Sequence, residues 1–132
     1  MELENVNAVK KLLNITANDY WHYHYRFDEE APYKPKKLGS VIIDNIIINT
    51  IVPVLFAYGL YQNVQQWKDR AIQYLSELAP EQNAITKQWK IKKVTNENAL
   101  DSQALIELKN NYCNLKHCLQ CSVGTKILKS KE

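Results

Sequence analysis

The fold class depends on one apolar stretch, residues 38–61, which reads LGSVIIDNIIINTIVPVLFAYGLY. By propensity alone, its many β-branched residues would favour a strand. The polar residues Asp44, Asn45 and Asn49 do not alternate with a period of two, however, and the run is long for a strand. We therefore predict that residues 38–51 form a helix. A buried hairpin of two strands is the alternative.

A proline and several polar side chains interrupt this stretch. Pro53 has no backbone N–H, so we expect it to kink or restart the helix, which then continues over residues 54–61. Asp44, Asn45 and Asn49 would be costly to bury in lipid. The sequence therefore predicts a buried core helix and no membrane span.

The flanking segments also have helical periodicity, because apolar residues recur in them every three or four positions. The apolar faces are Leu3, Val6, Val9, Leu12 and Leu13; Val64, Trp67, Ala71, Tyr74, Leu75 and Leu78; Ala84, Ile85 and Trp89; and Leu105, Leu108, Tyr112 and Leu115. Pro80 and Glu81 are typical of a first helical turn, and Asp101 or Ser102 can cap the last of these helices. We predict an all-α fold, a compact orthogonal bundle of about six or seven helices.

The length and composition indicate one ordinary domain. A chain of 132 residues can bury a hydrophobic core without metals or disulfides. We predict a single helical domain over residues 1–132, with a loop at about 28–37, where Pro32 and Pro35 stand among charges, and a basic tail at about 126–132.

Charge and cysteine usage bear on partners and compartment. The formal net charge is +3, which is too small an excess to indicate nucleic acid by itself. No secretory signal pattern opens the chain, and its three cysteines fall within nine residues, from Cys113 to Cys121. An odd, clustered set is typical of reduced thiols, so we predict a cytoplasmic protein.

The cysteines form the strongest chemical candidate. Cys113, Cys118 and Cys121 have C-x4-C-x2-C spacing, which could bring thiolates together on zinc or an iron–sulfur cluster. A fourth ligand is needed. His22 or His24 from the aromatic segment is sterically freer to reach the metal than His117, which is adjacent to a cysteine in the sequence, and we take His24 as the candidate. We favour the alternative that these cysteines pack as small hydrophobic residues and that no cofactor is bound. A redox pair is a third interpretation.

An aromatic segment lies between residues 18 and 27, where Tyr20, Trp21, Tyr23, Tyr25 and Phe27 are interleaved with His22 and His24. The pattern does not decide between a helix and an extended segment. Beside Lys34, Lys36 and Lys37, these rings could stack bases as single-strand binders do. We favour the interpretation that they form part of the core.

Histidines and buried polar residues could also form a catalytic site. His22 and His24 could act as acid–base groups, but a histidine among aromatic residues more often makes a structural hydrogen bond. We predict that Asp44, Asn49, Asp101 and Gln103 belong to a polar network, because buried polar groups need partners. No phosphate-binding glycine loop, nucleophile elbow or metalloprotease motif occurs in the sequence.

A combination of short motifs resembles the C-terminal part of an uncharacterised bacterial family, domain of unknown function 2851 (DUF2851). The motifs are Tyr20-Trp21, His24-Tyr25, Phe27, Lys37-Leu38-Gly39, INTIVP at 48–53, FAYG at 56–59, ALDSQAL at 99–105, Tyr112-Cys113, CLQC at 118–121 and Gly124. Family members are typically longer, with an N-terminal region that is similar to the PD-(D/E)XK nuclease fold. The resemblance implies a helical C-terminal module without that region.

The residues and the resemblance together predict an accessory or interaction module of a larger bacterial protein, without catalytic activity of its own. Its partner would be another protein or the missing N-terminal domain, and dimerisation through an apolar patch is also possible. The alternative is a metal- or iron–sulfur-binding module that assists a nuclease-like protein and meets nucleic acid. Clustered cysteines motivate this alternative.

Overall fold

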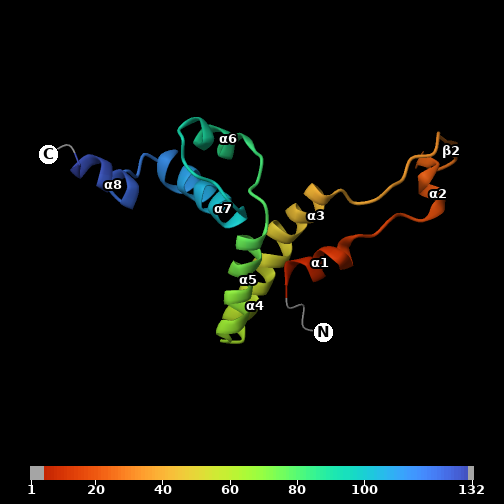
Figure 1. Cartoon of the computed structure of the whole chain (residues 1–132), viewed down its shortest axis with the longest axis horizontal. Coiled ribbons are helices and arrows are strands. Elements are labelled where there is room, and N and C mark those ends of the chain that lie inside the picture. Colours follow the sequence, from red (N-terminus) through yellow and green to blue (C-terminus); the bar gives the residue numbers. More distant parts are fainter. Residues whose placement is uncertain (1–4, 131–132) are drawn as a thin grey trace. The chain divides into compact units, whose positions relative to one another are not determined.

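The computed structural model describes residues 5–130, which divide into two compact units, the first ending at Tyr74 and the second beginning at Leu75 (Figure 1). The first unit contains α1 (Val6–Leu13), α2 (Asp19–His22), β1 (His24–Arg26), β2 (Glu29–Glu30), α3 (Ser40–Ile46), η1 (Ile47–Ile51) and α4 (Val52–Tyr61). The second contains α6 (Ala84–Ile91), α7 (Ala99–Glu107), η2 (Leu108–Cys113) and α8 (Ser122–Lys129), and α5 (Gln65–Glu77) crosses the boundary.

The predicted all-α class is confirmed, because the only sheet among residues 5–130 is the small pair β1–β2. The single domain over residues 1–132 stays a prediction. Of the predicted basic tail, Lys126 and Lys129 lie in α8, whereas residues 131–132 are outside the described residues.

Helix α1 follows the predicted amphipathic pattern. The side chain of Asn5 caps it by accepting a hydrogen bond from the backbone N–H of Ala8 at 3.0 Å. Val6 and Val9 are buried, and α1 contacts α3. Leu12 was expected on the same face but is exposed, so the buried face is narrower than predicted, and Leu3 lies outside the described residues.

The stretch 40–61 is helical throughout, as predicted, and the alternative of a strand hairpin is wrong. Its middle part, η1, is a π-helix in which the N–H of Val52 bonds to the carbonyl of Ile47. Pro53 explains this change, because it cannot donate to the carbonyl four residues before it and its ring would collide with that group. The widened turn absorbs the proline without ending the helix.

A close turn joins α4 to α5. Asn63 adopts a positive φ of 54°, which asparagine tolerates well, and the N–H of Val64 bonds to the carbonyl of Gly59 at 2.9 Å. A Cβ on Gly59 would lie 2.9 Å from the Cγ of Lys68. Glycine at this position therefore allows the start of α5 to lie close against α4.

The starts of α6 and α7 are set by asparagines. Asn83 and Thr86 form a reciprocal capping box, so α6 begins at Ala84, and the predicted first turn at Pro80 and Glu81 is wrong. Similarly, α7 is capped by Asn98, whose side chain accepts from the N–H of Asp101 at 3.0 Å. The predicted caps Asp101 and Ser102 instead lie inside that helix.

The core of the second unit holds α6 and α7 together. The indole N–H of Trp89 donates to the carbonyl of Leu105 at 3.1 Å, which ties α6 to α7. Leu78, Ala99 and Leu105 are buried, and the N–H of Ala99 bonds to the carbonyl of Leu78 at 3.0 Å. The segment before α6 is thereby fixed to the start of α7.

Residues 18–37 form an aromatic arm, in which the short helix α2 is followed by a tight hairpin of β1 and β2. The strands pair antiparallel, with His24 opposite Glu30 and Arg26 opposite Glu29. Asp28 in the turn has a positive φ of 61°, a conformation that aspartate adopts more readily than most residues. The predicted loop at 28–37 thus contains a short strand, and the undecided aromatic segment is partly helical and partly extended.

Candidate functional site

The three cysteines lie in one part of the second unit. Cys113 ends η2, and Cys121 is the residue before α8; Cys113 and Cys118 are exposed, and Cys121 is buried. All three line a single hollow of about 200 Å³, which is otherwise walled mainly by aromatic and aliphatic side chains, among them Trp89 and Tyr112. The C-x4-C-x2-C spacing therefore does bring the thiols to a common surface.

The turn that carries Cys118 is held against α8. A Cβ on Gly124 would collide with the carbonyl oxygen of Cys118, so only glycine fits at this position. The hydroxyl of Thr125 donates to the carbonyl of Leu119 at 3.2 Å, and the N–H of Thr125 bonds to the carbonyl of Cys121 at 2.8 Å. These contacts fix the CLQC turn to the first turn of α8.

Metal ligation by the cysteines stays a prediction. Within residues 5–130, no group of three or more His, Cys, Asp or Glu side chains is arranged to hold a metal ion. His24, the predicted fourth ligand, belongs to the aromatic arm, where its ring stacks on Tyr20 with centroids 3.9 Å apart. Its Nδ1 also lies 2.8 Å from the carbonyl oxygen of Tyr20.

His22 organises the aromatic arm. Its side chain is buried, and its Nδ1 accepts a hydrogen bond from the backbone N–H of Lys36 at 3.0 Å. Its Nε2 lies 3.4 Å from the hydroxyl of Thr16, which in turn donates to the carbonyl of Lys36 at 3.1 Å. The carbonyl of His22 also accepts from the N–H of Lys34 at 2.8 Å. His22 therefore fixes the path of the lysine-rich segment 34–37.

The polar residues of the 40–61 helix have local partners. The ammonium of Lys10 lies 2.7 Å from the carboxylate of Asp44, which connects α1 to α3. The side-chain amide of Asn49 donates to the carbonyl of Asn45 at 3.0 Å, one turn back, at the start of the π-helical segment. Asp44 thus joins two helices, whereas Asn49 bonds within its own helix.

In the second unit, a polar network is centred on Ser102, whose side chain is completely buried. Its hydroxyl accepts from the N–H of Glu81 at 2.9 Å and lies 2.8 Å from the side-chain oxygen of Asn96. Gln103 donates to the carboxylate of Glu81 at 2.7 Å, and Asp101 accepts from a backbone N–H just before α7 at 2.9 Å. The network therefore holds the segment before α6 in place.

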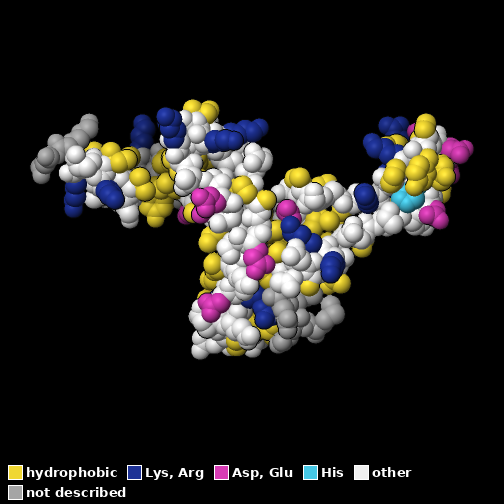
Figure 2. Space-filling view, viewed as in Figure 1, with side chains coloured by type: hydrophobic (Ala, Val, Ile, Leu, Met, Phe, Trp, Pro, Cys, Tyr) yellow, Lys and Arg dark blue, Asp and Glu magenta, His cyan; other side chains and the backbone are white. Residues whose placement is uncertain are grey.

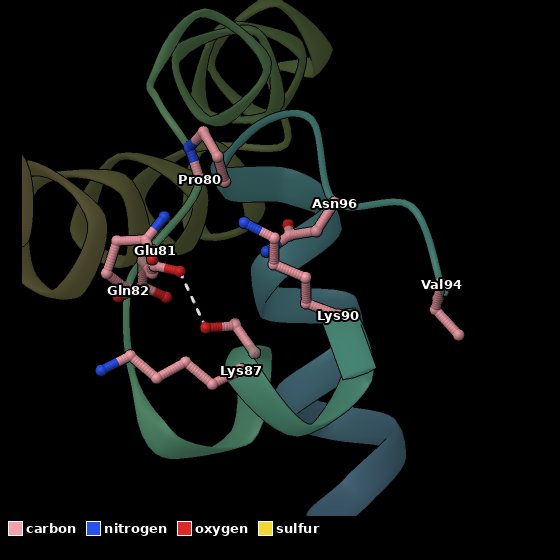
Figure 3. A pocket seen from close by; sticks show the side chains of 8 residues that line it. Pro80, Glu81, Gln82, Lys87, Lys90, Val94 and Asn96 are labelled. Atoms are coloured by element: carbon pink, nitrogen blue, oxygen red, sulfur yellow. Dashed lines mark hydrogen bonds between the residues drawn. The ribbon is translucent and has the colours of Figure 1, made fainter. Parts of the chain in front are cut away.

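Figure 3 shows the hollow beside this network. It has a volume of about 320 Å³ and is lined by residues including Glu81, Thr86, Lys87 and Lys90. The hydroxyl of Thr86 donates to the carbonyl of Glu81 at 2.9 Å, the bond drawn as a dashed line. Glu81, Thr86 and Asn96, which line this hollow, already bond within the capping box and the network, so these three residues support α6.

The aromatic residues of the arm are mostly exposed, so the prediction that they form part of the core is wrong. Phe27 is 74% exposed, Tyr25 61% and Tyr33 59%. The rings contact one another instead: Trp21 meets Phe27 edge to face with centroids 5.0 Å apart. The short hairpin offers too little surface to cover these rings, and sequence alone could not reveal this.

The 40–61 helix is also far more exposed than predicted. Ser40–Tyr61 has a mean hydropathy of 1.9 over its most apolar 18 residues, of which only 22% are buried. By length and composition it is the one helix among residues 5–130 that could cross a membrane. The prediction of a buried core helix is therefore wrong for most of its surface, because α1 and α5 cover only part of it.

These features define a helical chain with an exposed apolar helix, an aromatic arm and a hollow lined by three free thiols. The sequence pattern of a family described as "Protein of unknown function (DUF2851)" matches residues 1–84. The chain belongs to this family, as its motifs predicted. No curated protein and no solved structure matches it. The nuclease-like N-terminal region of longer members stays a prediction.

Proposed function

We propose that the chain is a helical interaction module that binds another protein through the outer face of α3, η1 and α4 and acts as an accessory part of a larger protein. The observation that carries this proposal is the low burial of the Ser40–Tyr61 helix, at 22% of its most apolar 18 residues. An extended apolar surface of this kind usually marks an interaction site.

The exposed side chains run along the helix. Val41 is 70% exposed, Val54 63% and Leu60 57%, and Tyr58 and Tyr61 also face outward. Covering one such side chain contributes about 1.5–3 kcal/mol. Tyrosines add rigid contact area, which is why they are frequent at protein interfaces. A partner that covered this face would therefore gain substantial binding energy.

Polar groups on the same surface favour a protein over lipid as the partner. Asn45, Asn49 and Thr50 are exposed between the apolar residues. In hydrocarbon, these amide and hydroxyl groups would lose their hydrogen bonds to water at a cost of several kcal/mol. A protein surface can supply both apolar contact and hydrogen-bond partners. The mixture of residues therefore fits a protein interface.

Site-specific photo-crosslinking in cells tests this proposal. A photoreactive amino acid replaces Tyr58 on the proposed face, and Ile91, which is 82% exposed in the second unit, serves as the matched control position. We expect a protein adduct of one defined mass from position 58 and none from position 91. The adduct should disappear when Val54 is changed to aspartate, since a charge at an apolar contact is costly.

Two outcomes would contradict the proposal. Lipid adducts from position 58 would make the helix a membrane segment, and equal adducts from both positions would show only non-specific contact. Circular dichroism of the Val54→Asp variant checks that the helix is retained. Because Val54 is 63% exposed, the substitution itself should leave the fold intact.

A further inference from the structure

A hollow in the aromatic arm combines lysines with an exposed ring. It has a volume of about 570 Å³ and is lined by Tyr25, Lys34, Lys36 and Lys37, together with apolar side chains. Three ammonium groups around one hollow create a positive potential that attracts anions. We call these four residues the basic-aromatic groove.

The groove is rigidly built, although it lies in an irregular segment. The imidazole of buried His22 accepts a hydrogen bond from the backbone N–H of Lys36 at 3.0 Å. The backbone carbonyl of His22 accepts one from the N–H of Lys34 at 2.8 Å. The carbonyl of Lys36 accepts from the N–H of Ala17 at 2.7 Å and from the hydroxyl of Thr16 at 3.1 Å. Since backbone atoms make these bonds, the exposed side chains of Lys34 and Lys37 stay available to a ligand.

Lys36 lacks an acceptor for its charge. Its ammonium lies 3.5 Å above the centre of the Tyr25 ring, and its buried Nζ has no hydrogen-bond partner among the described residues. Lys36 lowers the pKa of the Tyr25 phenol, desolvation opposes this effect, and Lys34 adds to it. The potential that favours a phenolate would equally favour a phosphate oxygen.

The arm also carries other exposed rings. Phe27 and Tyr33 are 74% and 59% exposed, and Tyr23 lies beside Tyr33 with ring centroids 5.3 Å apart. Bases can stack on such faces whatever their sequence. An acidic peptide would use the lysines but would leave these rings without a matching partner, so the combination favours nucleic acid.

The arm also carries four acidic residues, which balance its four basic ones. Asp28, Glu29 and Glu30 lie in the hairpin, where Glu29 is 3.7 Å from Arg26. In Figure 2, dark-blue side chains gather at the upper left of this arm, and the larger magenta groups lie on its right and lower sides. Three of the four basic residues fall within positions 34–37, so the positive charge of the arm is concentrated in that segment.

We propose that the aromatic arm binds single-stranded nucleic acid, with phosphates on the exposed Lys34 and Lys37, the buried ammonium of Lys36 adding to the positive potential, and bases stacked on Tyr25 and other exposed rings of the arm. A duplex would fit less well, because its bases are already stacked on one another. This site is separate from the proposed protein-binding face of α3 and α4, and neither proposal depends on the other.

Fluorescence anisotropy of a labelled twelve-nucleotide thymidine strand, titrated with the full chain at several salt concentrations, tests the proposal. The groove variant carries Lys34→Ala, Lys36→Ala and Lys37→Ala. We expect its affinity to fall at least tenfold and the slope of log K against log salt to shrink by about 1.4, since each of the two phosphate contacts, on Lys34 and Lys37, contributes about 0.7 with a single strand. Tyr25→Ala should weaken binding about fivefold while it leaves the slope unchanged.

The matched control carries Lys90→Ala, Lys92→Ala and Lys93→Ala, which removes the same charge from exposed positions of the second unit. We expect this control to change the affinity less than twofold. Equal losses in the two triple variants would overturn the proposal, because binding would then follow net charge alone. Equally tight binding of a polyglutamate peptide or of the corresponding duplex would also overturn the proposal. Circular dichroism confirms that each variant is folded.

Discussion

Replacing Ser102 with alanine should destabilise the second unit far more than the loss of one small hydroxyl would suggest. The side chain is completely buried. Its hydroxyl accepts a hydrogen bond from the N–H of Glu81 at 2.9 Å and donates one to the side-chain oxygen of Asn96 at 2.8 Å. Alanine leaves both groups without this partner. A buried group that loses its hydrogen bond costs about 1–3 kcal/mol, so we expect a total loss of about 2–3 kcal/mol.

Amide hydrogen exchange can measure this loss locally. The N–H of Ala99 donates to the carbonyl of Leu78 at 3.0 Å, within the same unit as Ser102, so its exchange rate reports the opening of that unit. We expect exchange to accelerate about 30- to 150-fold, which corresponds to a loss of about 2–3 kcal/mol. Denaturant unfolding followed by circular dichroism provides a second measurement.

The matched control is Ser122→Ala at the first residue of α8, where the side chain is exposed. A surface substitution of this kind should stay within about 0.5 kcal/mol of the unmodified chain. If Ser102→Ala also stayed within about 0.5 kcal/mol, the reasoning would be refuted, because water or relaxed neighbours would then replace the hydroxyl fully.

Two further predictions follow from local geometry. Gly124→Ala should destabilise α8 by more than about 1 kcal/mol, because the new Cβ would collide with the carbonyl of Cys118. Circular dichroism measures this loss. The control is Gly39→Ala, because a Cβ at Gly39 would meet no atom within 4 Å. The pKa of Tyr25 should lie below 10.0 and rise toward that value in Lys36→Met, because the substitution removes the ammonium that favours the phenolate. Nuclear magnetic resonance of carbon-labelled tyrosine measures it, and no change in Lys36→Met would contradict the assignment.

The helical nature of residues 40–61 could be predicted because the polar residues did not alternate, although β-branched side chains dominate the stretch. The π-helical turn before Pro53 could be anticipated only as a kink. Whether a proline breaks, bends or widens a helix depends on how neighbouring elements hold the helix on either side of it. Contacts of this kind are not visible in the residue pattern.

The helix starts show a similar limit. Pro80 and Glu81 have the composition of a first turn, but Asn83 begins α6 because Thr86 completes its capping box. Glu81 instead turns its backbone N–H toward Ser102. A side chain 21 positions away in the sequence thus competes with helix formation. Local propensity cannot account for a competitor at that distance.

The candidate sites were predicted in part. Spacing placed the three cysteines near one another, and the structure brings them to one hollow. The sequence showed the lysines of the basic-aromatic groove beside aromatic residues, but it led us to expect the aromatic rings in the core. Exposure depends on how much surface the rest of the unit can cover, and the short hairpin covers little. The role of His22 as the anchor of the lysine segment had no sequence signal beyond its aromatic neighbours.

By itself, the sequence determined the all-α class, the family and the approximate positions of the helices, because periodicity, capping residues and motifs are local properties of the chain. Only the tertiary structure decided which faces are covered. The apolar helix and the aromatic arm each carry enough hydrophobic residues for a core, yet both remain largely exposed. Burial is a property of neighbours distant in sequence, so the surfaces on which both proposals rest came from the structure alone.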